Sequence, residues 1–330
     1  MTRERSGRAG GAGRTELRVV VAVLTFRRPD DLAAVLPLLA EQVSALEPAG
    51  QILVVDNDPD GGARAAVERH GGVARYTHEA VPGIAAARNR ALALATADGA
   101  QLLVFIDDDE RPVGDWLHRL VRTYLDGHPA AVVGPVVSEF ATEPEAWIRA
   151  GRFFDRRRLA TGAEVTIAAT NNLLLDVAQV GAMGLTFDER FGLSGGSDML
   201  LTRQLTRAGG RMVWCAEAVV VDVVPPERLT RRWVLRRAFR SGNTWARTSV
   251  ALADGPLRRT AVRAVVAGQG LIRMLGGGAR VVLGCLGGSM AHRARGRRTL
   301  ARGAGMVAGV LGAIYVEYRR DLPRKTVMVQ

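Results

Sequence analysis

From Leu17 onward, short apolar runs alternate with segments of helical periodicity. Four apolar runs lie at 18–24, 52–55, 73–77 and 102–106, and the stretches between them place apolar residues at three- and four-residue intervals. Helices are expected from Pro29 and around 63–70, 85–97 and 115–126, with a further strand at 131–137. Strands that alternate with helices indicate a mostly parallel sheet with helices on both faces. The sequence therefore predicts an α/β fold with a Rossmann-like sheet.

The apolar run at 102–106 passes directly into four carboxylates, Asp107, Asp108, Asp109 and Glu110. Like charges this close repel and raise one another's pKa values, so a divalent cation would stabilise the cluster. The runs at 18–24 and 52–55 also end in polar residues, and the carboxyl ends of parallel strands meet at one edge of a sheet. This pattern predicts a metal and nucleotide site. The alternative is a solvated acidic turn, with Glu110 at the start of a helix that begins near Pro112.

After residue 137 the pattern is less regular. Residues 138–165 show no clear period, and a strand that carries Asn171 and Asn172 is expected at 166–176. A glycine-rich loop at 191–198 precedes a helix that should begin at Ser197 or Asp198 and end near Ala208. Two more strands are expected at 212–215 and 218–224. We therefore expect the α/β domain to span 17–226.

Beyond residue 226 the sequence is basic and rich in small apolar residues. Arginines alternate with Leu, Trp and Phe from 228 to 240, which predicts a basic amphipathic helix whose Arg236, Arg237 and Arg240 could clamp a diphosphate or bind lipid headgroups. Between 256 and 318 arginines interrupt the apolar runs, and the longest run, 303–316, is shorter than the ~20 residues that span a bilayer. We expect 227–330 to form helices that lie on an anionic membrane surface. The alternative is a helical hairpin packed on the catalytic domain.

Composition limits the remaining possibilities. The 330 residues carry a net charge of +12, but Lys325 is the only lysine, so the excess of arginine is weak evidence for a nucleic-acid partner and none is expected. Cys215 and Cys285 have no His or Cys nearby at ligand spacing, which argues against a disulfide framework or a zinc site. Residues 1–16 lack the apolar segment of a signal peptide and should form a disordered tail. We expect a cytoplasmic protein, peripheral on the inner face of the cell membrane.

Five short motifs occur in order along the α/β region. They lie at 23–29, 54–57 and 82–89, at the Asp-x-Asp sequence that ends in Asp107-Asp108-Asp109, and at Gly195-Gly196-Ser197-Asp198. Together they resemble the family 2 glycosyltransferases, inverting enzymes of the GT-A fold. The resemblance covers about 17–240. It implies transfer of a sugar from a nucleoside-diphosphate sugar to a hydroxyl acceptor, such as a cell-surface polysaccharide, a lipid-linked glycoside or a small-molecule glycoside.

The resemblance also implies roles for individual residues. Asp109 would ligate Mg²⁺ or Mn²⁺, and Asp107 would contact the ribose or the water shell of the metal. Asp108 is the variable middle position and could substitute in a shifted register. Further contacts with the nucleotide sugar would come from Thr25, Arg27, Asp56, Arg88, Asn171 and Asn172. Alternatively, Asp56 could begin the turn at 58–61, and an amide pair at a strand end can be structural.

A carboxylate is also needed to take the proton of the acceptor hydroxyl as its oxygen attacks the anomeric carbon. The resemblance to family 2 glycosyltransferases implies that this general base is Asp198. Relatives often carry two acidic residues in this motif, whereas Ser197 precedes Asp198 here, so a possible acceptor-positioning partner is missing. Many GT-A enzymes supply a further metal ligand, often His, from the strand after the acceptor helix. Asp222 lies in that segment here, but it could equally be a plain strand residue.

Two other functions fit part of the sequence. A sugar-nucleotide nucleotidyltransferase would use a similar sheet and acidic metal ligands, but residues 25–29 contain no glycine for a phosphate loop. The same feature argues against a dinucleotide-dependent oxidoreductase. A non-enzymatic, arginine-rich protein that binds membranes or nucleic acid would give no role to Asp107, Asp109 or Asp198. We therefore expect an inverting, metal-dependent glycosyltransferase.

Overall fold

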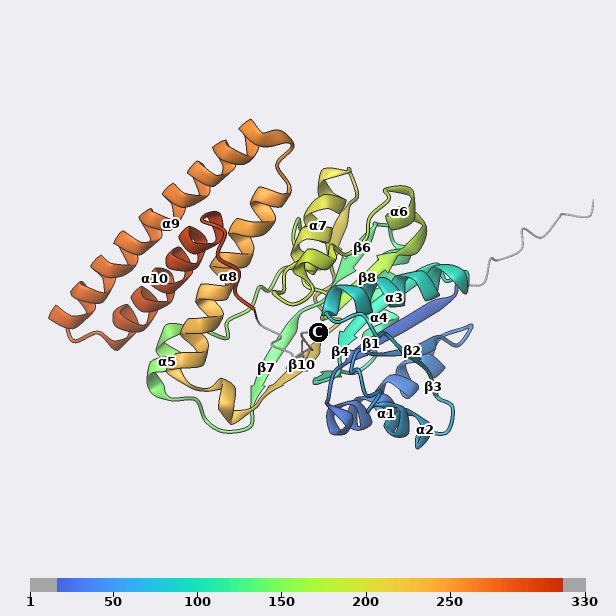
Figure 1. The fold of residues 1–330 in the computed structure, drawn as a ribbon. Coiled ribbons are helices and arrows are strands. Elements are labelled where there is room, and N and C mark those ends of the chain that lie inside the picture. Colours follow the sequence, from blue (N-terminus) through green and yellow to red (C-terminus); the bar gives the residue numbers. More distant parts are fainter. Residues whose placement is uncertain (1–16, 317–330) are drawn as a thin grey trace, which may run out of the picture.

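The computed structural model describes residues 17–316, and its centre is a seven-stranded sheet. The order is β3 (Ala74–His78), β2 (Gln51–Asp56), β1 (Val19–Thr25), β4 (Leu102–Asp107), β8 (Asn172–Asp176), β6 (Ala131–Val133) and β9 (Met212–Trp214). Neighbouring strands are parallel except at β8, which is antiparallel to β4 and β6. The predicted mostly parallel sheet is confirmed (Figure 1). The tail expected at 1–16 and the end of the expected C-terminal region, 317–330, lie outside the described residues.

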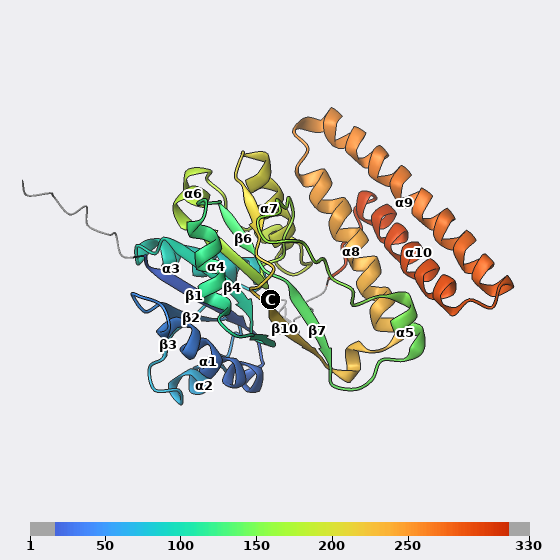
Figure 2. The same ribbon diagram turned by 180° about the vertical axis from the view of Figure 1, so that it is seen from behind.

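Helices cover both faces of this sheet (Figures 1 and 2). Leucines of α1 (Pro29–Ser44) and α4 (Trp116–Leu125) pack on one face, and residues of α3 (Ile84–Ala97) and α7 (Ser197–Arg207) pack on the other. Successive side chains of β1 enter opposite clusters, because side chains alternate along a strand. This explains why its sequence is a continuous apolar run. Shorter helices are α2 (Arg64–Glu68), α5 (Ala146–Gly151), α6 (Val177–Ala182), η1 (Glu189–Phe191) and η2 (Pro226–Arg228).

A small second sheet beside the first changes two predictions. It contains β5 (Glu110–Pro112), β10 (Val220–Val224) and β7 (Val136–Phe140). The single strand expected at 131–137 is therefore wrong, since β6 and β7 lie in different sheets. The strand is interrupted at Gly134, where a Cβ atom would lie 2.2 Å from the Ala218 carbonyl oxygen. The helix expected at 115–126 is present as α4, but the helix that the alternative interpretation begins near Pro112 does not form there, because Glu110 and Pro112 belong to β5. The strand expected at 166–176 is also shorter and begins at Asn172.

The C-terminal part of the described chain consists of α8 (Arg231–Ala251), α9 (Gly255–Leu286) and α10 (Met290–Val310). Glycines let α9 and α10 approach closely: a Cβ on Gly270 would lie 3.0 Å from the Gly303 oxygen, and one on Gly277 would lie 2.8 Å from the Gly296 oxygen. α10 packs equally closely on α8, where a Cβ on Gly242 would lie 1.9 Å from the Arg302 oxygen. The basic helix predicted at 228–240 forms from Arg231 onward as the start of α8, whereas Arg228 lies in η2. Among the described residues, the helices are too short or too polar to cross a membrane.

Candidate functional site

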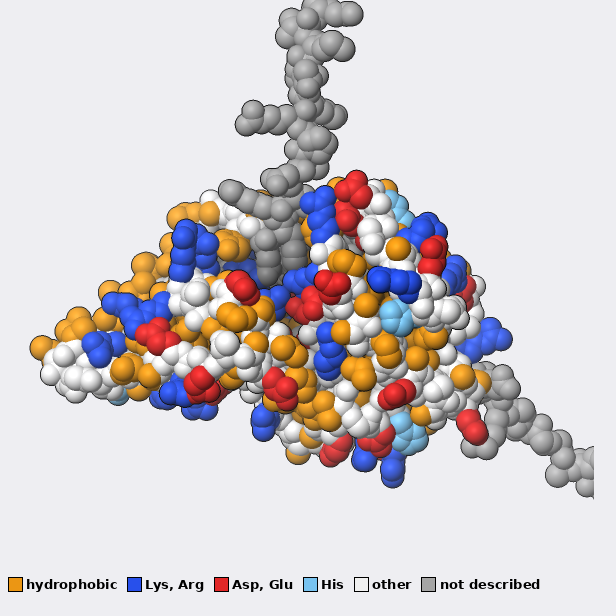
Figure 3. Space-filling view, turned by 90° about the horizontal axis from the view of Figure 1, so that it is seen from below, with side chains coloured by type: hydrophobic (Ala, Val, Ile, Leu, Met, Phe, Trp, Pro, Cys, Tyr) orange, Lys and Arg blue, Asp and Glu red, His pale blue; other side chains and the backbone are white. Residues whose placement is uncertain are grey.

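A cavity of about 700 Å³ opens at the carboxyl ends of β1 and β4. Side chains from both sheets, from the start of α7 and from α8 line it, and Figure 3 shows acidic and basic side chains close together on this face. The acidic lining residues are Asp107, Asp108, Asp109, Glu110, Asp198 and Asp222. The basic ones are Arg28, Arg88, Arg156, Arg228, Arg236, Arg237 and Arg240. Such a lining can hold an anionic ligand together with a cation.

The turn after β4 places Asp108 and Asp109 among cationic and hydroxyl groups. Asp108 is buried and accepts hydrogen bonds from Thr25 Oγ1 at 2.8 Å and from Arg28 Nη1 at 3.1 Å. Burial raises the pKa of Asp108 to about 6, although the Arg28 charge opposes the shift. Asp109 Oδ2 pairs with Arg28 at 2.8 Å and with Arg228 at 3.0 Å. Arg28 and Arg228, which the sequence did not single out for this site, thus neutralise the acidic turn.

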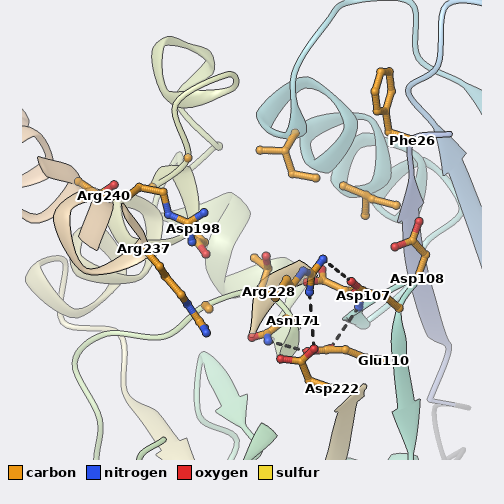
Figure 4. A pocket seen from close by; sticks show the side chains of 18 of the residues that line it. Phe26, Asp107, Asp108, Glu110, Asn171, Asp198, Asp222, Arg228, Arg237 and Arg240 are labelled. Carbon is orange, nitrogen blue, oxygen red and sulfur yellow. Dashed lines mark hydrogen bonds and ion pairs between the residues drawn. The ribbon is translucent and has the colours of Figure 1, made fainter. Parts of the chain in front are cut away.

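Asp107 is different, because its carboxylate has no hydrogen bond or ion pair with any described residue. It ends β4 and faces the cavity, as Figure 4 shows. Burial raises the pKa of Asp107 to about 7, and the negative charge of Asp109 adds to this effect. The charge of Asp198, which lines the same cavity, also raises the pKa of Asp107. On the β4 side, Asp107 is therefore a carboxylate without an ion pair among the described residues, and the charge of Arg88 only partly opposes the rise in its pKa.

Asp198 lies in the first turn of α7, after a tight glycine loop. Gly195 and Gly196 have φ values of 74° and 103°, which glycine adopts more readily than other residues. The loop brings Asp198 to the cavity on the side where Arg237 and Arg240 of α8 also lie (Figure 4). Neighbouring Ser197 is fully buried and accepts a hydrogen bond from Arg88 Nη1 at 2.9 Å. Arg88 thereby connects α3 to the start of α7 and also lines the cavity.

Glu110 is a site residue that the sequence led us to misplace. It is 2% exposed, and one carboxylate oxygen accepts a hydrogen bond from Asn171 Nδ2 at 2.7 Å. Burial, reinforced by the Asp107 charge, raises the pKa of Glu110 well above its usual value. The expectation that Glu110 begins a helix is therefore wrong. Glu110 lies in β5 and holds Asn171 at the cavity wall. A three-residue strand such as β5 is too short to show a period in the sequence.

Three residues predicted to bind the nucleotide sugar do not line the cavity: Arg27, Asp56 and Asn172. Arg27 is exposed and pairs with Asp58 and Asp60. Asp56 is fully buried, and its two oxygens accept hydrogen bonds from Asp58 N, Ala63 N and Tyr76 Oη. The contacts of Asp56 match the alternative role in the turn that follows β2.

Asn172 is also placed differently from the prediction. It is 1% exposed and binds Trp116 Nε1 at 2.9 Å, the Pro135 oxygen at 3.0 Å and the Ala218 oxygen at 2.8 Å. The side chain therefore ties β8 to α4 and to the segments that lead into β7 and β10 of the second sheet. Of the amide pair, Asn171 lines the cavity and Asn172 is structural.

The structure pairs Asp222, the predicted third metal ligand, with arginines. Its carboxylate forms an ion pair with Arg156, and its other oxygen lies 3.8 Å from Arg228 Nη1. Within residues 17–316, no cluster of three or more His, Cys, Asp or Glu side chains has the arrangement of a metal site. Asp107 and Asp109 remain the two carboxylates of the Asp-x-Asp motif that could serve as metal ligands.

Comparison with known proteins decides the family. The profile described as Glycosyl transferase family 2 matches residues 20–178. A curated relative, the succinoglycan biosynthesis protein ExoM of Rhizobium meliloti (strain 1021), is 34% identical over 246 residues, which is 72% of this chain and 77% of the relative. The chain belongs to glycosyltransferase family 2. The resemblance expected from the motifs is confirmed, and the protein is a glycosyltransferase.

Solved structures show that this family 2 glycosyltransferase has the GT-A fold. The mannosyltransferase PcManGT from Pyrobaculum calidifontis, in complex with GDP-Man and Mn²⁺, matches with a TM-score of 0.56 and 18% identity, over 89% of this chain and 88% of that chain. GalNAc-T7 with UDP, GalNAc and Mn²⁺ matches with a TM-score of 0.52 and 12% identity, over 76% of this chain and 54% of that chain. At these identities the likeness concerns the fold alone.

Proposed function

We propose that this glycosyltransferase moves a sugar from a nucleoside-diphosphate sugar to a hydroxyl acceptor during assembly of a cell-surface polysaccharide. We further propose that a divalent cation assists the transfer and that the anomeric configuration is inverted. The similar proteins support the substrate classes: one relative is named for succinoglycan biosynthesis, and two structures contain nucleotides with Mn²⁺.

The observation that carries the proposal is the pair of carboxylates that face one cavity from two elements. Asp107 ends β4, and Asp198 lies in the first turn of α7 on the other side. Arginines of η2, α3 and α8 line the same space. Two separated carboxylates can serve two ends of one substitution: one near the leaving group and one near the attacking hydroxyl.

The residues near Asp107 fit a bound divalent cation. Mg²⁺ in nucleotide sites is usually held by one or two carboxylates together with substrate phosphates, so three protein carboxylates are not required. Asp107 offers a carboxylate without a partner among the described residues, and Asp109 lies two residues away at the cavity wall. When bound, the cation would neutralise the negative charge that develops on the departing diphosphate.

The remaining cavity residues suit the anionic part of the donor. Arg28 and Arg228 approach Asp109 from different elements and would meet a diphosphate placed beside that turn. Arg237 stands near the rings of Phe154 and Trp233, at 5.7 and 5.4 Å from their centroids. Burial, with the charges of Arg156 and Arg240, lowers the pKa of Arg237 to about 10, so the side chain remains a cation at neutral pH. Arginine binds phosphate oxygens through two parallel hydrogen bonds.

We assign Asp198 as the general base. Its carboxylate would accept the proton of the acceptor hydroxyl while the acceptor oxygen forms the new bond to the anomeric carbon. The bond between that carbon and the diphosphate oxygen breaks, and its electron pair leaves with the nucleoside diphosphate. Attack from the face opposite the leaving group inverts the anomeric centre. Arg88 and Ser197 position the start of α7 for this step through their hydrogen bond.

The test is Asp198→Asn, with Asp30→Asn as a matched control. Asp30 is an exposed acidic residue in the first turn of α1 and lies outside the cavity. Asp198→Asn should lower turnover by about 10²–10⁴-fold, the usual contribution of a general base, and leave the affinity for the donor nucleotide within twofold. Asp30→Asn should change neither quantity. Wild-type turnover in Asp198→Asn would disprove the assignment of the base.

A further inference from the structure

The outward side of α9 is an apolar surface that other described residues leave uncovered. The exposed residues lie on one face of the helix, since their spacing matches its 3.6-residue period, and we call them the α9 stripe: Leu257, Val265, Leu271, Ile272, Leu275, Val282, Leu283 and Leu286. Ile272, Leu275 and Leu286 are 71%, 75% and 81% exposed. The buried glycines of α9 instead face α10. Figures 1 and 2 show α9 at the outer edge of the molecule.

The charge around this stripe has a single sign. Residues 255–310 contain ten arginines and neither Asp nor Glu. Arg258 and Arg263 are exposed near the start of α9, and Arg297 and Arg302 are exposed on α10. An apolar stripe bordered by arginines is complementary to a membrane surface that contains anionic lipids.

The same charge disfavours a second copy of this chain as the occupant. A symmetric dimer through the α9 stripe would bring equivalent surfaces together, so arginines of one copy would face arginines of the other. Within 255–310 there is no carboxylate to pair with them. Since the described helices cannot cross a membrane, α9 would lie along the lipid surface and not through it.

We propose that α9 is a membrane-docking helix, which rests on anionic lipid with the α9 stripe at the boundary between headgroups and acyl chains. This inference goes beyond the proposed reaction, because the stripe contains no cavity residue. α10 connects α9 to α8 through glycine contacts, and α8 lines the cavity, so docking would hold the catalytic cavity beside the membrane.

The first experiment measures sedimentation of the full chain with vesicles of phosphatidylcholine, alone or mixed with phosphatidylglycerol. The wild type should bind the anionic vesicles, bind neutral vesicles weakly, and lose affinity as salt increases. The triple variant Ile272→Gln, Leu275→Gln and Leu286→Gln should bind at least about a hundredfold more weakly, because three side chains no longer enter the apolar layer.

A matched control changes exposed apolar residues elsewhere: Val73→Gln with Leu125→Gln, which are 42% and 51% exposed in the wild type. This control should bind as the wild type does. Equal loss in both variants, or no vesicle binding by the wild type, would overturn the proposal. A wild-type dimer that the triple variant abolishes, without vesicle binding, would identify a second copy as the occupant and would also overturn it.

A measurement on the otherwise unchanged chain covers the case in which the triple variant fails to fold. Cys285 is exposed on α9, whereas Cys215 is buried, so an environment-sensitive fluorophore should attach at Cys285 alone. On anionic vesicles its emission should shift to the blue, and brominated lipids should quench it. Unchanged emission while the protein sediments with vesicles would mean that another surface docks, and the proposal would fail. Asp107→Asn should lose nucleotide binding but keep wild-type vesicle binding and probe emission. The membrane proposal and the proposed reaction can therefore fail independently.

Discussion

Asn172 provides the sharpest test of how the two sheets hold the site together. Its side chain uses one acceptor and two donors, to Trp116 Nε1 and to the Pro135 and Ala218 oxygens. Asn172→Ala removes all three hydrogen bonds at a position that is 1% exposed. The N–H group of Trp116, a fully buried residue of α4, would then have no partner.

The cost follows from these contacts. A hydrogen bond contributes about 0.5–1.5 kcal/mol net, and a buried donor left without a partner costs about 1–3 kcal/mol. We therefore expect the free energy of unfolding to fall by about 3–5 kcal/mol. With an unfolding entropy of about 2.1 cal/mol/K per residue, over ~300 residues this lowers Tm by roughly 5–8 °C.

The assay is thermal unfolding followed by circular dichroism, with Asn171→Ala as the adjacent control. Asn171 makes one side-chain hydrogen bond, to Glu110, at the cavity wall. Asn171→Ala should leave Tm within about 2 °C and raise KM for the donor, whereas Asn172→Ala should lower Tm and leave KM close to wild type at low temperature. A normal Tm with a raised KM in Asn172→Ala would refute the structural role assigned to it.

Three further predictions follow from other contacts. Gly277→Ala should destabilise the protein by about 1–3 kcal/mol, because its Cβ would lie 2.6 Å from Leu300 N, whereas neighbouring Gly276→Ala meets no atom within 4 Å and should be neutral or stabilising in chemical denaturation. Burial and the hydrogen bond to Asp176 raise the pKa of Tyr124 to about 12. The unfolded chain therefore loses this proton first, and the free energy of unfolding should fall between about pH 10 and 12; a wild-type slope in Tyr124→Phe would contradict this. Arg28→Leu should weaken nucleoside-diphosphate binding in titration calorimetry, and unchanged affinity would exclude a contact with the diphosphate.

Much of the catalytic fold could be predicted because long buried strands leave strong patterns. β1, β2 and β4 are apolar runs with polar ends, and their parallel pairing places Thr25 beside Asp56 and Leu24 beside Asp107. The parallel register itself thus brings the predicted polar ends to one edge.

The second sheet could not be predicted, since β5 has three residues and β7 follows β6 after only Gly134 and Pro135. Glu110 was misplaced for this reason. Residue type also could not predict the different roles of Asn171 and Asn172, because both are asparagines. The side chain of Asn171 lines the cavity, whereas that of Asn172 is buried and bonds to Trp116, Pro135 and Ala218. Arg28 and Arg228 pair with Asp109 from distant parts of the chain, and spacing alone carries no signal for such contacts.

The central claim is that the β4 carboxylates bind a nucleoside diphosphate through a divalent cation. Titration calorimetry of UDP, GDP and TDP with and without Mn²⁺ tests it directly, in the wild type and in Asp107→Asn. We predict that one of the nucleotides binds the wild type at least about tenfold more tightly with Mn²⁺, and that Asp107→Asn removes this difference. Equal affinity with and without Mn²⁺ for all three nucleotides, or a full Mn²⁺ effect in Asp107→Asn, would contradict the account.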